Sequence, residues 1–189
     1  MLIFYMLVIR VGEIELAGQK CRIRPVVPGD VLRVYEIESN VFGDDKFDIM
    51  LLRDLITNSL IFVVLEDAQA NIIVGFCILL EIDSVEARAS GDYDPNVEPA
   101  AHLVNIALDE AYRYHGWGKT LMQYCLEILR ERGFRRVQLE VNVANAPAAA
   151  LYQGLGFRRV KFLPNYYQSG SNAYRMEKFL HGTGELENA

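Results

Sequence analysis

The 189-residue chain is short of cysteine and of positive charge. Its three cysteines, Cys21, Cys77 and Cys125, lie far apart in apolar runs, which argues against a disulfide framework and for a reducing compartment. No CxxC pair or histidine–cysteine cluster occurs, so a metal site is not expected. A net charge of −6 disfavours nonspecific binding to nucleic acid, which needs a basic surface. We therefore expect a cytoplasmic protein that binds neither a metal nor nucleic acid.

Long apolar runs are also missing. Residues 1–9 are apolar, but no basic residues precede them, and a transmembrane helix needs roughly 20 such residues. We interpret this run as a buried strand, not as a signal peptide or a membrane span. The length and the 51% hydrophobic content favour one domain with its own core. We expect this domain at 21–180, after an extension (1–20) that adds a strand or hairpin, and before a flexible tail (181–189).

Hydrophobic periodicity and turn residues predict alternating strands and helices. We expect strands at 8–11, 13–16, 21–25, 60–65, 72–82, 101–108, 137–143, 157–162 and 172–179. Helices are expected at 31–41, after an N-cap at Asp30, and at 47–55, 117–132 and 146–154. This order indicates a single α/β domain with a mixed sheet.

A glycine-containing loop joins the predicted strand 101–108 to the predicted helix 117–132. Backbone N–H groups and the positive end of the dipole at a helix start attract anions, and glycines let a phosphate approach the backbone. The Rossmann fingerprint fails because Leu121 replaces its third glycine, and a P-loop fails because its first glycine would fall on Arg113. Arg113, Gly116 and Gly118 instead resemble the RxxGxG pyrophosphate loop of the GNAT acyltransferases, although a plain strand-to-helix turn stays open on this loop alone.

A second motif decides between these alternatives. The segment from Asn145 to Phe157, NAPAAALYQGLGF, matches the GNAT pattern NxxAxxLYxxxGF at every specified position. The chain therefore resembles a GNAT N-acetyltransferase from about Cys21 to Phe179. That resemblance implies a mixed, mostly antiparallel twisted sheet of about seven strands, with helices on both faces. It also implies a V-shaped splay between two central parallel strands.

The resemblance implies acetyl-CoA as the acetyl donor. In that family the strand ahead of the glycine loop pairs with the pantetheine arm, and the loop wraps the pyrophosphate. An asparagine and a tyrosine of the second motif lie beside the pantetheine and the thioester. The residues of this chain that are thereby implied to bind the cofactor are Ile106, Ala107, Leu108, Arg113, Tyr114, His115, Gly116, Trp117, Gly118, Lys119, Thr120, Asn145 and Tyr152.

Two narrower resemblances concern the catalytic groups. The sequence Leu-Glu-Val around Glu140, twelve residues before Tyr152, looks like the RimI-type ribosomal-protein N-terminal acetyltransferases, in which the glutamate is the general base and the tyrosine the general acid. In archaeal Ard-type enzymes a histidine is directed at the substrate amine from the strand position of His102. Which of the two is the dominant base stays open. A solvated strand face, a core aromatic and a strand-end histidine are the plain structural alternatives for Glu140, Tyr152 and His102.

The same resemblances concern the amine substrate. Tyr166 and Tyr167 match the paired tyrosines with which Ard-type enzymes hold the first residues of a peptide. Phe42 and Gly43 correspond to the loop that lines the pocket for the first side chain, but they depart from its more familiar proline-containing versions. Cys125 lies in the apolar stripe of its helix, so we expect direct attack by the amine and no covalent nucleophile.

We therefore predict an enzyme that transfers the acetyl group of acetyl-CoA to the free α-amino group of protein N-termini, ribosomal proteins among the candidates. The partners expected are protein or peptide N-termini, and no membrane is expected among them. We also expect association with a ribosome or an auxiliary subunit, and a monomeric or homodimeric state. Two alternatives stay open. One is a GNAT acetyltransferase for a small-molecule amine or a lysine side chain, and the other is a non-catalytic acetyl-CoA-binding module of a larger complex.

The charge is unevenly divided along the chain. Residues 111–161 contain nine basic and three acidic residues, a net charge of +6, whereas the rest of the chain has a net charge of −12. The positive segment is the one assigned to the phosphates of the cofactor. The acidic loop at 83–100 is expected to flank the substrate mouth and to attract a cationic N-terminus.

Overall fold

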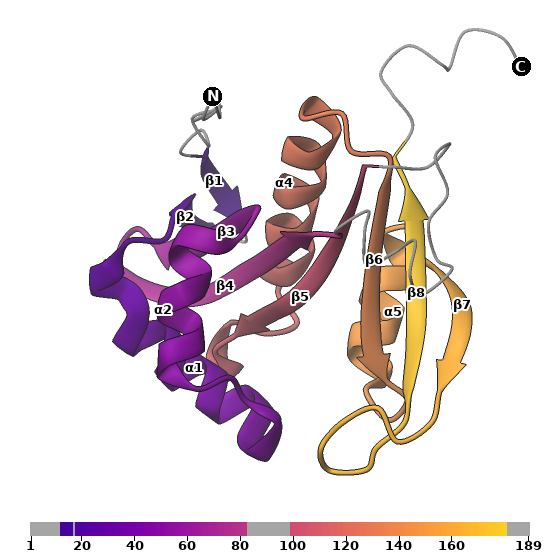
Figure 1. Ribbon diagram of the computed structural model, residues 1–189. Coiled ribbons are helices and arrows are strands. Elements are labelled where there is room, and N and C mark those ends of the chain that lie inside the picture. Colours follow the sequence, from indigo (N-terminus) through magenta and orange to yellow (C-terminus); the bar gives the residue numbers. More distant parts are fainter. Residues whose placement is uncertain (1–11, 17, 83–98, 181–189) are drawn as a thin grey trace, which may run out of the picture.

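The computed structural model describes residues 12–16, 18–82 and 99–180, whose strands form one eight-stranded sheet (Figure 1). The sheet order is β1-β2-β3-β4-β5-β6-β8-β7, and β5–β6 is its parallel pair. The expected mixed, mostly antiparallel sheet is thus confirmed, with β1 adding a strand to the seven expected. The bounds are β1 Gly12–Leu16, β2 Gln19–Pro25, β3 Ile61–Asp67, β4 Ile72–Glu81, β5 Ala100–Leu108, β6 Arg136–Asn142, β7 Arg158–Leu163 and β8 Ala173–Phe179.

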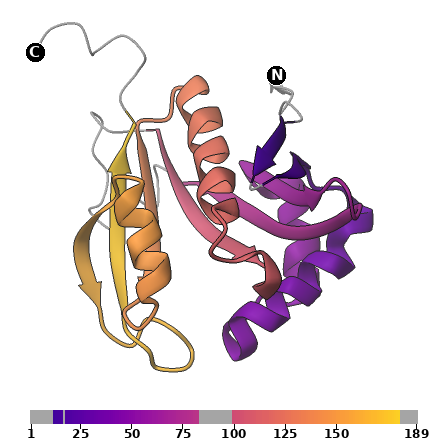
Figure 2. The same cartoon turned by 180° about the vertical axis from the view of Figure 1, so that it is seen from behind.

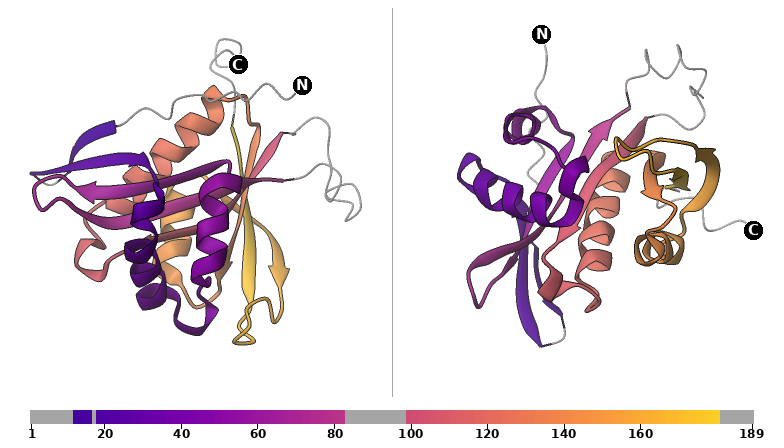
Figure 3. Two further views of the ribbon diagram at one scale, coloured as in Figure 1. Left: turned by 60° about the vertical axis from the view of Figure 1, so that its left-hand side comes forward. Right: turned by 90° about the horizontal axis from the view of Figure 1, so that it is seen from below.

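Helices cover both faces of this sheet, as expected. Figures 2 and 3 show α1 (Val31–Phe42) and α2 (Ile49–Asn58) on one face, and α4 (Trp117–Glu131) and α5 (Ala146–Gly154) on the other. Helix α2 begins two residues later than predicted, because the Asp48 carboxylate accepts the N–H groups of residues 50 and 51 and so caps the helix. Three short 3₁₀ turns complete the described helices: residues 28–30 precede α1, residues 43–45 follow it, and residues 110–112 precede the glycine loop.

Asp30 is the N-cap residue of α1, as predicted, but its side chain does not cap the helix. Its carboxylate instead accepts two hydrogen bonds from the Arg24 guanidinium, at 2.7 and 3.0 Å, and one from the Val27 N–H at 2.8 Å. Arg24 also contacts Glu66 on β3 at 2.6 Å. The bidentate pairing with Arg24 is stronger than a single neutral cap bond, which explains why Asp30 faces the sheet.

Apolar side chains form a core on each face of the sheet. The predicted stripe of α4, which includes Leu121, Cys125 and Leu129, is buried against β3–β6 together with residues of α5. On the other face, Val34 and Ile37 of α1 pack with residues of α2, β3 and β4. These two layers hold the central strands between them and leave the strand ends available for a site.

The two parallel strands separate partway along their length. They are in register from Ala100–Arg136 to Leu103–Leu139, and beyond this point they diverge, as Figure 1 shows. Val104 forms a bulge at the same place, because Leu79 pairs with Leu103 and Ile78 with Asn105. An extra residue shifts the alternation of a strand by one position. His102 and Asn105 therefore both face α1 and α2, although they are three residues apart, and the predicted splay is confirmed.

Some expectations concern residues outside the described ranges. The strand predicted at 8–11, residues 83–98 of the acidic loop and the tail at 181–189 lie there. Of that loop the structure describes Pro99 and Ala100, and β5 begins at Ala100. Within the described residues, no helix is long and apolar enough to cross a membrane. The same residues contain no group of three or more histidine, cysteine, aspartate or glutamate side chains arranged to hold a metal ion.

Candidate active site

Glu140 lies one residue beyond the last β5–β6 pair, where the two strands begin to separate. Its carboxylate is 5% exposed and contacts four polar side chains. Oε2 lies 2.6 Å from Nε2 of His102 and accepts the Tyr166 hydroxyl at 3.3 Å. Oε1 accepts Nε–H of Arg175 at 2.9 Å and the Gln138 amide at 3.3 Å. Three strands and one loop therefore converge on this carboxylate.

The surroundings of Glu140 keep it ionised. Burial raises the pKa of this carboxyl, but the hydrogen bonds from His102 and Arg175, the positive charge of Arg175 and the charge that His102 carries when protonated outweigh burial, so the pKa lies below its ordinary value. A carboxylate has about four lone-pair positions, and the four neighbours occupy them. Glu140 is thus a saturated acceptor, with poor capacity to take a proton from a substrate directly.

His102 is the group that this arrangement leaves able to accept a proton. Because ionised Glu140 can only accept, the short contact requires that Nε2 of His102 carries the proton and donates it. The lone pair of the neutral ring then lies on Nδ1, for which no hydrogen bond is formed within the described residues. The imidazole is 30% exposed, so a ligand can reach it. Carboxylate-oriented histidines of this kind are suited to general base catalysis.

Strand alternation and register explain why these side chains meet. Leu139 and Val141 face the core beneath α4, so Glu140 between them faces α1 and α2. In the antiparallel β6–β8 ladder Glu140 stands directly opposite Arg175. In the parallel β5–β6 pair His102 stands opposite Gln138, two residues before Glu140 and on the same face.

The loop between β7 and β8 covers this group. The rings of Tyr166 and Tyr167 pack edge to face with centroids 5.1 Å apart, and burial, followed by neighbouring charges, raises the pKa of each phenol to about 12. The same loop reaches α1–α2, because Asp45 accepts the backbone N–H of Ser169 at 3.3 Å and its hydroxyl at 3.2 Å. The predicted tyrosine pair therefore lies beside Glu140, and the loop that carries it also contacts the α1–α2 connection.

Tyr152 occupies a buried position on α5. Its ring packs edge to face against Phe157 with centroids 5.8 Å apart, and the side chain is 6% exposed. Burial, followed by the proximity of Cys77 and Tyr167, raises the pKa of this phenol far above its ordinary value. The hydroxyl therefore keeps its proton at neutral pH, as a proton donor must.

The glycine loop brings backbone N–H groups to the start of α4. Gly116 is the N-cap residue with φ +87°, a left-handed conformation that favours glycine, and no side chain caps the helix. A Cβ atom at Gly116 would meet nothing within 4 Å, so the space beside this residue is open. Lys119 is exposed in the first turn, and Nε of Arg113 binds the Leu108 carbonyl at 3.1 Å. This end of α4 fits an anionic group such as a pyrophosphate.

The remaining predicted cofactor residues lie around the splay. The register of β5 with β6 ends at residue 103, so the β6-facing backbone edge at Ile106–Leu108 lies beyond their common ladder. Trp117 is buried, and its indole packs edge to face on Tyr112, where it lines the cavity beside the glycine loop. Asn145 uses its side chain to cap α5 by accepting the Ala148 N–H at 3.1 Å. These positions fit an extended, amide-containing arm between β5 and β6.

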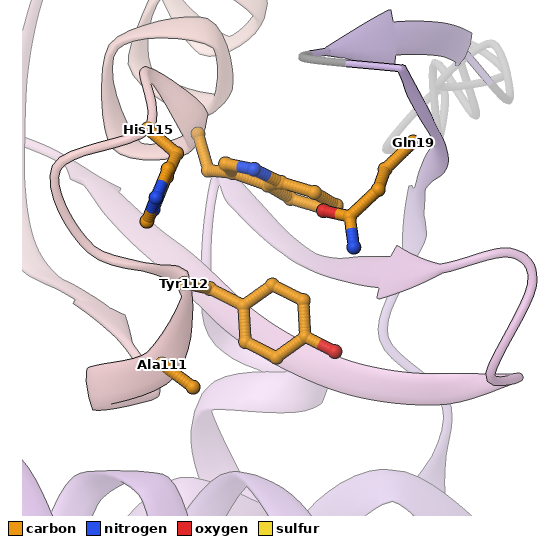
Figure 4. Close-up of a pocket in the computed structure, with 5 residues that line it drawn as sticks. Gln19, Ala111, Tyr112 and His115 are labelled. Atoms are coloured by element: carbon orange, nitrogen blue, oxygen red, sulfur yellow. The ribbon is translucent and has the colours of Figure 1, made fainter.

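A separate cavity of about 310 Å³ lies beside the glycine loop, between it and the start of β2. Figure 4 shows Tyr112, His115 and Gln19 around this space, with Ala111 at its edge. His115, expected to donate to a phosphate, lines this cavity. Tyr114 adopts φ +65° and is 85% exposed, so its side chain projects away from the core.

Several contacts of the site were not predicted from the sequence. Arg175 and Gln138 bind Glu140, and Asp45 binds the tyrosine loop. Gln138 and Glu140 alternate with apolar residues on β6, a pattern that could have placed Gln138 on the same face as Glu140. Of the two residues predicted to line the first side-chain pocket, Phe42 packs partly against the α1–α2 core. Gly43, with φ +56°, ends α1.

Comparison with known proteins agrees with this geometry. The profile described as the acetyltransferase (GNAT) family matches residues 31–157, so the chain belongs to the GNAT acetyltransferase family. An N-alpha-acetyltransferase from Sulfurisphaera tokodaii is 42% identical over 83 residues, which are 43% of this chain and 50% of that protein. The [ribosomal protein bS18]-alanine N-acetyltransferase of Escherichia coli is 42% identical over 67 residues, 35% of this chain and 45% of that protein. The chain thus spans about half the length of these curated relatives.

Solved structures match over more of the chain. Ard1 from Thermoplasma volcanium superposes with a TM-score of 0.72 at 29% identity, over 85% of this chain and 98% of that one. NAA60 of Arabidopsis thaliana, crystallised with acetyl-CoA, superposes with a TM-score of 0.73 at 21% identity, over 85% of this chain and 99% of that one. The second likeness concerns the fold alone.

Proposed function

We propose that this protein transfers the acetyl group of acetyl-CoA to the free α-amino group of protein N-termini. The observation that carries the proposal is the His102–Glu140 contact of 2.6 Å at the point where β5 and β6 separate, beside Tyr166. A base at the opening of the splay suits an amine that attacks an acyl group held between the strands. The names of the Sulfurisphaera and Escherichia relatives support an α-amine as the acceptor.

The cofactor assignment follows from the fit of the residues present. The uncapped start of α4 with Lys119 would hold the pyrophosphate, and the backbone edge of β5 at Ile106–Leu108 would hold the pantetheine arm. When bound there, acetyl-CoA supplies an activated acetyl thioester. The positive segment at 111–161 favours an anionic ligand at this end of the site.

In the proposed reaction His102 would accept one proton and Tyr152 would donate another. Nδ1 of His102 accepts a proton from the acceptor ammonium, while Glu140 holds the ring and stabilises the imidazolium that forms. With acetyl-CoA bound, the neutral nitrogen would replace the sulfur on the acetyl carbon and would lose its second proton to solvent. Tyr152, which keeps its hydroxyl proton, would donate that proton to the departing sulfur and would recover one from solvent. A protein α-amine has a pKa of about 7.7–8.0, so the base has only a modest task near neutral pH.

A peptide assay tests this proposal. Short peptides with a free N-terminus and one internal lysine, matched peptides with an acetylated N-terminus, and spermidine are incubated with acetyl-CoA, and fragmentation mass spectra locate the acetyl group. We expect the acetyl group on the α-amine of the free peptides. Acetylation confined to lysine or spermidine would contradict the choice of acceptor, and acetyl-CoA binding without transfer would point to a non-catalytic module.

The setting of the enzyme is part of the proposal. The three buried cysteines are free, which supports a reducing compartment, and we propose the cytoplasm. Ribosomal proteins are proposed among the acceptors, so one peptide of the assay carries a ribosomal-protein N-terminus. Association with a ribosome or an auxiliary subunit, and a monomeric or homodimeric state, stay predictions that sedimentation with and without ribosomes would test.

A further inference from the structure

A second carboxylate lies beneath the site, and the proposed reaction does not use it. Glu38 on α1 is fully buried, with 0% exposure. Its Oε1 accepts the backbone N–H of Phe47 at 2.9 Å and the side-chain amide of Asn105 at 2.9 Å, and Oε2 accepts the same amide at 2.8 Å. No ion pair with a cation is formed by Glu38 within the described residues.

These three contacts join three parts of the site. Asn105 is on β5, three residues after His102, and the bulge at Val104 places both side chains on the same face. Phe47 immediately precedes Asp48, the N-cap of α2. Residues 42–48 connect α1 to α2, and through Asp45 they also reach the tyrosine loop. Through its hydrogen bonds Glu38 thus links β5, which carries His102, to residues 42–48, which in turn contact the tyrosine loop.

The cost of this arrangement indicates that it has a role beyond packing. Moving a carboxylate out of water is unfavourable when only neutral donors surround it, and burial raises the pKa of Glu38 to about 7 despite the three hydrogen bonds. A leucine or methionine of similar volume would fill the same apolar layer between α1 and the sheet without this cost. What an apolar side chain cannot do is hold the Phe47 N–H and the Asn105 amide at defined positions.

We propose that Glu38 is a positioning residue for the acceptor substrate: it holds residues 42–48 in place relative to His102, so that an N-terminus entering between this segment and the tyrosine loop lies within reach of the base. This inference rests on the proposed function. It assigns to Glu38 an effect on binding of the acceptor, and no contact with either substrate.

Three variants separate positioning from general stability. Glu38→Ala leaves the Phe47 N–H and the Asn105 amide without their acceptor. The double variant Glu38→Gln with Asn105→Asp exchanges donor and acceptor across the pair, and its glutamine oxygen can still accept the Phe47 N–H. Glu36→Gln is the matched control, because Glu36 is on the same helix but exposed, where it pairs with Arg33.

The readouts are the steady-state constants for a free-N-terminus peptide and for acetyl-CoA, with hydrogen–deuterium exchange of residues 42–48 at one pH. We expect Glu38→Ala to raise the peptide KM about tenfold and to speed exchange in the segment, since it removes three buried hydrogen bonds. The acetyl-CoA KM and kcat should stay within about twofold of the wild type, the double variant should recover most of the peptide KM, and Glu36→Gln should change nothing.

Two results would overturn the inference. One is an unchanged peptide KM and unchanged exchange in Glu38→Ala. The other is an equal loss for peptide and acetyl-CoA that the double variant does not repair, which would mean a structural role alone. If Glu38→Ala does not fold, Glu38→Gln replaces it, with the same expectations at smaller size. Because the exchange measurement needs no acceptor, faster exchange in an enzyme inactive on all peptides would reject the proposed function and leave the anchoring of residues 42–48 supported.

Discussion

Replacing Glu140 with glutamine tests whether His102 and Glu140 act as one catalytic unit. Glutamine has nearly the same shape, but it offers one oxygen and one N–H₂ group. The oxygen is expected to face Arg175, whose charged donor lies 2.9 Å away, because charge-assisted hydrogen bonds are roughly twice as strong as neutral ones. The amide nitrogen then faces Nε2 of His102 and forces the ring proton onto Nδ1. The tautomer that can accept a proton at Nδ1 is lost.

The expected magnitude follows from this change of tautomer. A general base contributes roughly 10²–10⁴-fold to the rate, which corresponds to about 3–5 kcal/mol of activation free energy. The loss belongs at the lower end, about 10²-fold at neutral pH, because an α-amine with a pKa of about 7.7–8.0 is already partly neutral there. His102→Ala should lose the same factor, and the double variant no more than either single one, since residues that act as a unit are not additive.

The assay is kcat/KM for a free-N-terminus peptide at saturating acetyl-CoA, from about pH 6 to about pH 9.5. Above the pKa of the amine most acceptor molecules are neutral, so the rates of all three variants should approach that of the wild type as the pH rises. Glu177→Gln is the control, because Glu177 pairs with Arg136 at 3.0 Å in the same β6–β8 ladder, outside the site. It should affect stability but not the pH profile.

Two outcomes would refute the reasoning. If the double variant loses the product of the two single factors, His102 and Glu140 act independently. If Glu140→Gln is inactive while His102→Ala keeps nearly full rate across the pH range, Glu140 is itself the base and the histidine is incidental.

Four further predictions concern the cofactor site, the acid and the pH dependence of stability. Gly116→Ala should cost about 1 kcal/mol of stability, because φ is +87°, and should raise the acetyl-CoA KM. Gly133→Ala, just after α4 and with φ +80°, is the control: it should cost similar stability and leave that KM unchanged. Kinetic and melting assays in parallel measure both effects. Tyr152→Phe should lower kcat by about 10²-fold in steady-state kinetics with little change in the acetyl-CoA KM, since the ring packing on Phe157 is kept. The lowered pKa of Glu140 means that its charge stabilises the fold above its unfolded-state value of about 4.5, and that this contribution is lost as the pH falls through the lower folded value; the melting temperatures of wild type and Glu140→Gln should therefore converge in acid. The raised pKa of Glu38, about 7, has the opposite sign: the native state holds the proton more tightly, so stability falls as pH rises from about 4.5 to about 7, and melting of Glu38→Gln should lack this slope.

Much of the fold was predictable because it depends on local patterns. Apolar runs bounded by turn residues predicted the central strands, the apolar stripe of α4 is buried as its spacing predicted, and α5 has its predicted bounds with Asn145 as cap. The glycine positions predicted a turn into a helix, and Gly116 does adopt a left-handed conformation there. A difference arose where a local preference met a stronger partner: the Asp30 carboxylate binds the Arg24 guanidinium and therefore does not cap α1, although Asp30 is its N-cap residue.

Within the site, the sequence alone supplied the candidate residues, which stay predictions, and the apolar neighbours at i−1 and i+1 indicate the face on which Glu140 lies. The tertiary structure decided which side chains meet. His102 contacts Glu140 across 38 residues because β5 and β6 are parallel and in register just before they diverge, and Arg175 is added by the β8 register. Glu38 and Asn105, 67 residues apart, meet because one bulge shifts the alternation of β5. Propensity and periodicity act over a few residues, whereas register, bulges and strand divergence are set by packing of the whole sheet.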